Sequence, residues 1–277
     1  MARPSLPELR SLPLARGRTL RLGRPLVMGI LNVTPDSFSD GGRLPAPDGP
    51  AFVAVVHRML DDGADILDIG GESTRPGHAA VPVAEELRRV LPVVEAIRRA
   101  APAAILSIDT RKAEVARAAL AAGADFVNDV SGLGDPAMAA VVREAGCAIV
   151  LMRDQPCRGD VVAAAASQFA GLVAKARTAG ISDAQLVLDP GLGFGDPPGG
   201  DPVANMALLE GVPAYSHGFP VLVGASRKRF IGTLTGEADP ARRVAGSVAA
   251  ARRAVECGAA IVRVHDVRET VAALRVA

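Results

Sequence analysis

Short apolar runs alternate with longer amphipathic segments along most of the chain. The first run, Leu26–Leu31, has the length and composition of a buried parallel strand. Similar runs lie at Ala104–Ile108, Gln185–Leu188 and Val221–Gly224. The intervening segments, rich in Ala, Arg and Glu, have helical character at Ala51–Leu60, Ala84–Ala100, Ala113–Ala121, Val161–Ala179 and Ala241–Glu256. Strands that alternate with helices predict a parallel sheet.

Four further strands are predicted by a recurring pattern of a glycine, small residues and an apolar run. The pattern begins at Gly63, Gly123, Gly146 and Gly258. We interpret each glycine as the C-terminal cap of a helix and the run after it as a strand. Eight strand–helix pairs in 277 residues favour an α/β fold of the (β/α)8 TIM barrel type over a doubly wound sheet. We expect one domain over residues 26–277, preceded by a lead-in segment over residues 1–25.

The loop lengths predict which end of the barrel carries a site. Connections from helix to strand are short, whereas several from strand to helix are long, at Val33–Gly49, Gly71–Val83, Arg153–Asp160 and Asp189–Pro202. In such a barrel the long loops share the face on which active sites lie.

Polar residues recur at equivalent strand positions near this face. Counted from the capping glycines, the first position holds Asp68, Asn128 and Arg263, with apolar Leu151 as the exception. Two residues further on are Gly70, Val130, Arg153 and His265. Residues two apart point to the same side of a strand, so polar groups should converge at the mouth and bind a polar ligand.

Composition excludes several classes of function. A net charge of +1 gives no global field that favours nucleic acid or a membrane surface. No apolar run reaches transmembrane length, and the N-terminus has no continuous apolar core of a secretory signal. The three cysteines, Cys147, Cys157 and Cys257, match no disulfide or metal spacing. We therefore expect a reducing, cytoplasmic setting, with a transit peptide as the weaker interpretation of the N-terminus.

Other strand ends carry polar residues as well, and each has a plain structural alternative. Asn32 ends the first strand, where an ordinary strand and surface loop are an equal interpretation. Asp109, at the start of Asp109-Thr110-Arg111-Lys112, would alone be a helix N-cap. Asp189-Pro190 would alone be a turn, and Ser226-Arg227-Lys228 a basic loop. Their joint occurrence at successive strand ends favours a site.

The residue types at these strand ends suit a flat heterocycle. Asp109, Asn128 and Asp189 offer acceptors to ring N–H and amino groups, and Asn128 also offers donors. Lys228 and Arg263 suit a carbonyl or an anionic group. The loop Gly70–Gly77 is small and rich in hydroxyls, so it can hold phosphate, although it lacks the ending of a P-loop. His265 either binds phosphate or holds its strand end.

At these residues the chain resembles the bacterial dihydropteroate synthases, a family of pterin-binding barrels. The resemblance covers most of residues 26–276 and rests on short stretches that are highly specific together: Met28–Gly42, Asp68–Gly77, Ser107–Thr110, Asn128–Val130, Leu188–Gly195, Ser226–Lys228 and Arg263–Val267. It implies a transferase of folate biosynthesis. Such an enzyme condenses 6-hydroxymethyl-7,8-dihydropterin diphosphate with p-aminobenzoate to give 7,8-dihydropteroate and pyrophosphate. The resemblance also implies Mg²⁺ dependence, a homodimer and a sulfonamide target.

The resemblance implies roles for single residues. Asp109, Asn128, Asp189 and Lys228 would hold the pterin, with Arg263 stacked on it. Asn32 would bind Mg²⁺, while Thr74, Arg263 and His265 would take the diphosphate. Ser226, Phe38 and Pro76 would frame p-aminobenzoate, and Met152 and Phe194 would also contact substrate. The residues expected closest to the chemistry are Asp109, Lys228, Arg263 and His265.

The physical chemistry of these residues suits a largely dissociative step. Mg²⁺, Arg263 and His265 would stabilise charge on the departing pyrophosphate, and the loops over residues 33–42 and 71–82 would exclude water. No nucleophilic triad is needed, and the sequence indicates no base beside Ser226.

Two departures from the family pattern keep other functions open. Met152-Arg153-Asp154 replaces Met-His-Met, and Asp196 with an insertion up to Asp201 replaces a lysine. They leave open a barrel that binds pterin without turnover. A pterin-binding methyl-transfer domain is the other alternative, but such a domain has no need for Ser226-Arg227-Lys228 or the diphosphate loop.

Overall fold

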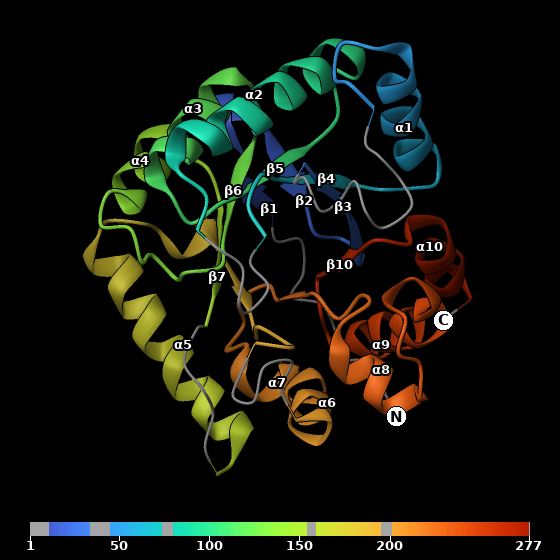
Figure 1. Cartoon of the computed structure of the whole chain (residues 1–277). Coiled ribbons are helices and arrows are strands. Elements are labelled where there is room, and N and C mark those ends of the chain that lie inside the picture. Colours follow the sequence, from blue (N-terminus) through green and yellow to red (C-terminus); the bar gives the residue numbers. More distant parts are fainter. Residues whose placement is uncertain (1–10, 34–44, 74–79, 154–158, 195–200, 277) are drawn as a thin grey trace.

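The computed structural model describes residues 11–33, 45–73, 80–153, 159–194 and 201–276, and in them a parallel barrel is surrounded by helices (Figure 1). Its strands are β3 (Leu26–Asn32), β4 (Ile66–Gly70), β5 (Leu106–Asp109), β6 (Phe126–Asp129), β7 (Ile149–Met152), β8 (Leu186–Asp189), β9 (Leu222–Val223) and β10 (Ile261–Val264). They pair in the order β8-β7-β6-β5-β4-β3-β10-β9. A parallel bridge between Leu188 and Val221 joins the two outer strands, so the predicted TIM barrel is confirmed.

The helices pack around the outside of the strands. They are α1 (Pro50–Asp61), α2 (Val83–Ala100), α3 (Ala113–Ala122), α4 (Met138–Ala145), α5 (Val161–Thr178), α6 (Pro202–Glu210), α7 (Val212–Tyr215), α8 (Arg229–Thr235), α9 (Val244–Glu256) and α10 (Val267–Arg275). The segment predicted as one helix over Ala241–Glu256 is a 3₁₀ turn at Pro240–Arg242 followed by α9. Within the described residues, no helix is long and apolar enough to cross a membrane.

The predicted capping glycines explain the tight turns between helices and strands. Gly63, Gly123, Gly146 and Gly258 all have positive φ, between 61° and 129°. This region of backbone conformation is open to glycine and strained for other residues. After Gly123, for example, Ala124 is fully buried and β6 starts two residues later. Each of the four strands therefore begins three residues after its glycine.

Strand register accounts for the one exception in the polar pattern. Asn128 pairs with Val150, and Asp189 pairs with Met152. Val150 and Met152 therefore lie on the same face of the sheet as the polar residues, and Leu151 lies on the opposite face. Asn128 lies five residues after its capping glycine, but its partner Val150 lies only four residues after Gly146. The count of five that locates the polar position in β6 therefore overshoots by one residue in β7.

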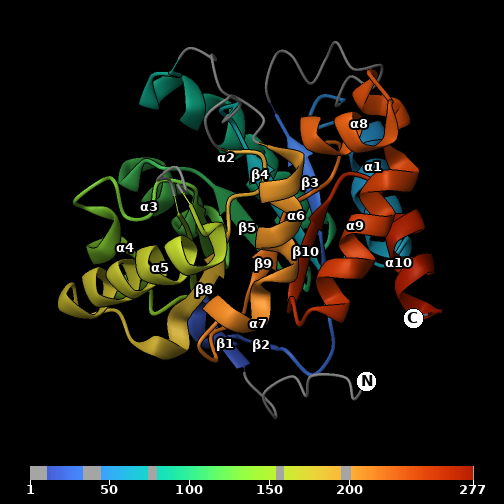
Figure 2. The ribbon, with the colours of Figure 1, turned by 90° about the horizontal axis from the view of Figure 1, so that it is seen from below.

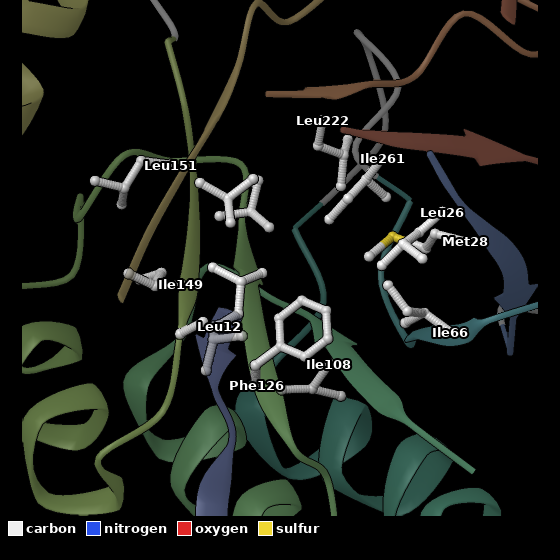
Figure 3. Packing of buried hydrophobic residues seen from close by; sticks show 14 of the residues in the cluster. Leu12, Leu26, Met28, Ile66, Ile108, Phe126, Ile149, Leu151, Leu222 and Ile261 are labelled. Carbon is white, nitrogen blue, oxygen red and sulfur yellow. The ribbon is translucent and has the colours of Figure 1, made fainter. Parts of the chain in front are cut away.

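A short antiparallel hairpin closes the end of the barrel where the strands begin. It consists of β1 (Ser11–Pro13) and β2 (Thr19–Arg21), within the segment predicted as a lead-in (Figure 2). Its leucines at 12, 14, 20 and 22 are buried in the same hydrophobic cluster as Phe126 and Ile149 (Figure 3). The hairpin backbone also bonds to the barrel, since Ala148 N–H donates to Pro13 at 2.8 Å. Residues 11–22 therefore contribute to the core.

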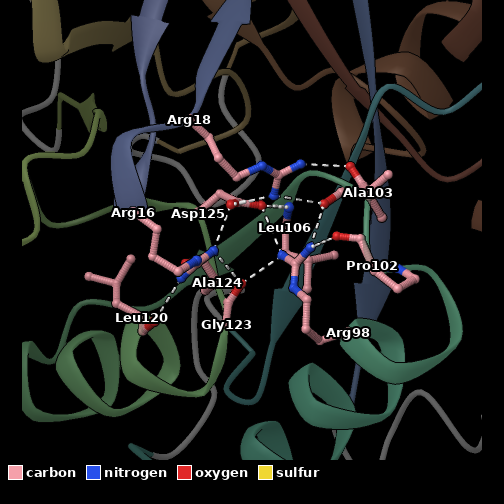
Figure 4. Close-up of polar contacts among 11 residues, drawn as sticks. Arg16, Arg18, Arg98, Pro102, Ala103, Leu106, Leu120, Gly123, Ala124 and Asp125 are labelled. Atoms are coloured by element: carbon pink, nitrogen blue, oxygen red, sulfur yellow. Dashed lines mark hydrogen bonds and ion pairs between the residues drawn. The ribbon is translucent and has the colours of Figure 1, made fainter.

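One buried carboxylate ties the hairpin to the barrel. Asp125 is fully buried at the start of β6, and its Oδ1 accepts from Arg16 and Arg18, each at 2.7 Å (Figure 4). Its Oδ2 accepts from Arg98 at 3.0 Å and from the backbone of Leu106 at 2.9 Å. Both oxygens are thus paired, and the arginines also bond to nearby carbonyls, so the cluster is a structural brace.

We predict that Asp125→Ala lowers the free energy of unfolding by about 3 kcal/mol or more, because the arginines lose a buried counter-ion. Chemical denaturation measures the change. Glu144→Ala is the control, since its ion pair with Arg117 is exposed and should contribute less than about 1 kcal/mol. Equal effects of the two substitutions would contradict the role of the brace.

Candidate functional site

At the other end of the barrel, the carboxyl ends of neighbouring strands bring the predicted polar residues together. Asp68, Asp109, Asn128 and Asp189 come from β4, β5, β6 and β8, and Arg263 comes from β10. All four acidic or amide side chains are almost completely buried. We call Asp68, Asp109, Asn128 and Arg263 the polar floor.

Arg263 is held by two carboxylates that come from the adjacent strands β4 and β5. Its Nε donates to Asp68 Oδ2 at 2.6 Å, and its Nη2 donates to Asp109 Oδ2 at 2.7 Å. Burial alone would lower the pKa of this guanidinium, but the nearby carboxylates outweigh burial and raise it. Arg263 is therefore a fixed cation whose Nε and Nη2 are each bonded to a carboxylate.

The polar floor keeps several buried acceptor atoms open. Asn128 Nδ2 donates to Asp68 Oδ2 at 3.1 Å, which leaves the amide oxygen turned elsewhere. Within the described residues, the oxygens without a hydrogen-bond partner include Asp68 Oδ1, Asp109 Oδ1 and Asn128 Oδ1. A buried acceptor without a donor costs about 1–3 kcal/mol, so such a cluster indicates a ligand rich in N–H groups.

Asp109 is not a helix cap. Helix α3 begins at Ala113, and the N–H of that residue donates to Asp135 at 2.9 Å. Burial raises the pKa of Asp109 to about 7, since desolvation and the carboxylates of Asp68, Glu86 and Asp189 outweigh the attraction of Arg263. A carboxyl that titrates near neutral pH inside a barrel mouth is typical of a functional group.

Lys228 and Asp189 are two further charged groups of the barrel mouth, and each favours the charged form of the other. Lys228 Nζ donates to the carbonyl of Leu192 and lies 4.4 Å from the ring centre of Phe194. Burial raises the pKa of Asp189 and lowers that of Lys228 to about 8. A Cβ atom at Gly193 would lie 2.6 Å from Lys228 Cδ, so a larger residue at position 193 would require the lysine side chain to move. Asp189 Oδ1 also accepts from Gly191, so the predicted Asp-Pro turn is present together with the site.

Ser226 has a base beside it, contrary to the expectation from the sequence. Its Oγ lies 3.0 Å from His265 Nδ1, and the backbone N–H of His265 also donates to it at 3.1 Å. The two residues are 39 positions apart, and β9 and β10 pair side by side, which no local pattern indicates. The pair holds the imidazole at the rim of the mouth.

Comparison with known proteins identifies the family. The family model described as pterin binding enzyme matches residues 28–265. The dihydropteroate synthase of Escherichia coli strain K12 is 44% identical over 274 residues, which cover 95% of this chain and 94% of that protein. The chain belongs to the dihydropteroate synthase family of pterin-binding enzymes.

Solved structures agree with this family. The dihydropteroate synthase of Xanthomonas albilineans with 4-aminobenzoic acid is 49% identical, with a TM-score of 0.87 and coverage of 96% of this chain and 97% of that chain. The same enzyme in complex with 7,8-dihydropteroate is 48% identical, with a TM-score of 0.85 and coverage of 95% and 97%.

The remaining predicted contacts of this family member are divided between described and undescribed residues. Thr74, Phe38 and Pro76 lie outside the described residues. Met152 is buried at the end of β7, and Phe194 lies under the Lys228 ammonium. Asn32, which the resemblance assigns to Mg²⁺, ends β3 beside Gly70.

One of the two departures from the family pattern is visible in the structure. Arg153 is buried directly after β7, its Nη1 donates to Gln168 at 3.3 Å, and its backbone N–H donates to Asp189 at 3.2 Å. Its charge also helps to offset the burial that raises the pKa of Asp189. The other departure, Asp196 and the insertion after it, falls largely outside the described residues.

The sequence did not predict an ionic network close to Asp109, in which Lys112 pairs with Glu72 and Glu86. Lys112 Nζ donates to Glu72 at 2.5 Å and to fully buried Glu86, which also accepts from Thr110 at 2.7 Å. Burial opposes ionisation of Glu72, but its hydrogen bonds from Lys112, Val81 and Arg111 outweigh burial and lower the pKa. Glu86 lies among the apolar residues of the buried face of α2, and this position in the sequence could have indicated a buried ion pair.

We predict that Lys112→Met lowers the free energy of unfolding by about 3–5 kcal/mol, because two buried carboxylates lose the cation between them. Chemical denaturation measures the effect. Arg88→Met is the matched control, since its ion pair with Glu85 lies on the exposed side of α2. A loss no larger than that of the control would show that the network contributes little.

Proposed function

We propose that the chain catalyses dihydropteroate synthesis with its polar floor, Asp189 and Lys228 as the pterin site and with Mg²⁺ bound at Asn32. In this reaction the amine of p-aminobenzoate attacks the methylene carbon of 6-hydroxymethyl-7,8-dihydropterin diphosphate. A C–N bond forms, the C–O bond to pyrophosphate breaks, and the amine loses a proton. The observation that carries the proposal is the cluster of open acceptors at Asp68, Asp109 and Asn128.

The pterin ring matches the chemistry of this site. Its 2-amino group and ring N–H groups are donors along one edge, and Asp109 Oδ1 and Asn128 Oδ1 are acceptors that lack donors among the described residues. Lys228 is a donor suited to the pterin carbonyl. Arg263 supplies a flat cationic surface, because its guanidinium plane is held by Asp68 and Asp109.

The residues at the end of β3 fit Mg²⁺ bound together with a diphosphate. A Cβ atom at Gly70 would lie 3.6 Å from both Asn32 Oδ1 and Asp109 Oδ2, so glycine leaves room beside these oxygens. Asn32 is a neutral ligand, and no group of three or more His, Cys, Asp or Glu side chains suited to a metal occurs in the described part of the chain. The diphosphate would therefore supply most ligands and would have its charge neutralised by the ion.

The chain's own residues then support departure of the pyrophosphate and attack by the amine. Arg263 and His265 would face the departing oxygens and stabilise the negative charge that develops on them. The electron-rich pterin relieves positive charge on the methylene carbon. Ser226 would face p-aminobenzoate while its hydroxyl holds His265. The X. albilineans enzyme with 4-aminobenzoic acid supports the assignment of this second substrate.

A coupled assay that follows pyrophosphate release tests the proposed activity. Release that requires both the pterin diphosphate and p-aminobenzoate is expected. A chain that binds pterin but releases no pyrophosphate would instead be a binding protein, and transfer of a methyl group would indicate the other class of pterin barrel. The homodimer, the cytoplasmic setting and inhibition by sulfonamides, which are analogues of p-aminobenzoate, belong to the same proposal.

We predict that Asn32→Ala weakens Mg²⁺-dependent diphosphate binding about tenfold or more, because one ligand of the ion is lost. Calorimetric titration with pyrophosphate, with and without Mg²⁺, measures this. Free pterin serves as the control ligand and should bind as before. Unchanged pyrophosphate affinity in the presence of Mg²⁺ would exclude Asn32 as the ligand.

We predict that Asp109→Asn weakens pterin binding by about 2–4 kcal/mol, or about 30- to 1,000-fold, because a donor replaces an acceptor at a buried site. The variant should stay folded but melt at a lower temperature, because Arg263 loses one of its two carboxylate partners. Affinity within a few-fold of the parent protein would make Asp109 a structural residue.

The same carboxyl predicts how pterin affinity depends on pH. With the pKa of Asp109 at about 7, the acceptor form dominates above pH 7 and the protonated form below it. The contribution of Asp109 to affinity should therefore be constant well above pH 7 and fall about tenfold per pH unit below it, whereas loss of the Lys228 proton, with a pKa of about 8, acts separately at higher pH. Calorimetry across this range measures the profile, and Asp109→Asn should abolish the component that this carboxyl contributes.

A further inference from the structure

We propose that Asp68 is a positioning residue that sets the orientation of the Asn128 amide and holds Arg263 away from competing with the pterin. The inference rests on the proposed pterin site and assigns a role to a residue outside the predicted ligand set. Asp68 comes from the middle of β4, where it pairs with Ser107 of β5, and its side chain is fully buried.

The hydrogen bonds of Asp68 determine which atom of Asn128 faces the ligand. An ionised carboxylate can only accept, so the nitrogen of the amide must turn toward it. Asn128 Nδ2 does so at 3.1 Å, and Asn128 Oδ1 is thereby left buried and open, like Asp109 Oδ1 on the neighbouring strand. Without Asp68 both amide orientations become available, and one of them presents a donor to the donors of the pterin.

The second bond of Asp68 controls the position of Arg263. Its Oδ2 accepts from Arg263 Nε at 2.6 Å, while Asp109 takes the Nη2 end at 2.7 Å. Without Asp68 the guanidinium keeps only Asp109 as a carboxylate partner, and it can move onto the oxygen of Asp109 that the pterin needs. One buried carboxylate thus keeps two acceptors, on β5 and β6, available to the same ligand edge.

The first test compares two buried carboxylates at opposite ends of the barrel. Asp68→Ala and Asp125→Ala each remove a fully buried acceptor of arginine hydrogen bonds. Calorimetry with free 6-hydroxymethylpterin gives the affinity, and thermal denaturation gives the stability. We expect both variants to melt at lower temperature, but only Asp68→Ala to lose pterin affinity, by about 30-fold or more.

Steady-state kinetics should separate the substrates in the same way. For Asp68→Ala the KM for the pterin diphosphate should rise while the KM for p-aminobenzoate at saturating pterin stays within about threefold. A general loss of structure would change both. Pterin affinity of Asp68→Ala within threefold of that of Asp125→Ala would overturn the inference.

A second pair of variants tests the inference even if Asp68→Ala does not fold. Asn128→Asp places two carboxylates face to face, whereas the exchange Asp68→Asn with Asn128→Asp restores one donor and one acceptor to the pair. In the exchanged protein the amide nitrogen at position 68 faces the carboxylate at 128, which keeps an acceptor toward the ligand. The recovery is only partial, because Arg263 Nε loses the oxygen that it shares with Asn128 in the parent protein. We expect the exchange to recover about tenfold or more of the affinity lost in Asn128→Asp.

The outcomes distinguish this inference from the proposed function. Absence of 6-hydroxymethylpterin binding to the unsubstituted protein would overturn the pterin site and the role of Asp68 together. The other outcome is that the unsubstituted protein binds 6-hydroxymethylpterin, but the exchanged protein loses as much binding free energy as Asp68→Asn and Asn128→Asp together. That outcome would overturn the role of Asp68 and leave the proposed function intact.

Discussion

The ion pairs of Arg263 with Asp68 and Asp109 govern the interior of the barrel mouth. Burying one charge alone is prohibitive, and burying a pair is balanced only when geometry and further hydrogen bonds are good. Arg263 provides that balance from β10 for carboxylates on β4 and β5, at 2.6 and 2.7 Å. The compensation is incomplete, because Asp109 still titrates near neutral pH. A ligand with several hydrogen-bond donors would therefore stabilise the carboxylates of the polar floor.

The two ends of the barrel use the same ionic chemistry for different purposes. Asp125 at the lower end accepts four hydrogen bonds, and both of its oxygens are paired. Asp68 and Asp109 at the upper end each keep one oxygen without a partner among the described residues. A carboxylate whose oxygens are all hydrogen-bonded stabilises the fold. A buried oxygen without a partner costs stability but can accept a hydrogen bond from a ligand. Both ends carry buried charges, so the carboxylate oxygens without a hydrogen-bond partner are what distinguish the end with the candidate site.

Sequence patterns predicted the barrel because its information is local. Capping glycines, apolar runs and the lengths of the loops repeat along the chain, and the strand ends follow from them. The partners of the polar residues could not be predicted in this way. Arg263 and Asp68 are 195 positions apart, and their contact depends on closure of the whole barrel. Ser226 and His265 are likewise joined only by pairing of β9 with β10. The one-residue error in β7 arose because period two is sensitive to a single residue of turn length.

Support for Asp109 extends beyond the polar floor into the helices. The carboxylate of Glu86, on α2, is one of the charges that raise the pKa of Asp109. Lys112 Nζ is bonded to Glu86, and Thr110, the residue after Asp109, donates to the same glutamate. The cation thus offsets a charge that would otherwise favour protonation of Asp109. The segment Asp109-Thr110-Arg111-Lys112 therefore carries both the proposed acceptor for the ligand and the cation that pairs with the neighbouring carboxylate of Glu86.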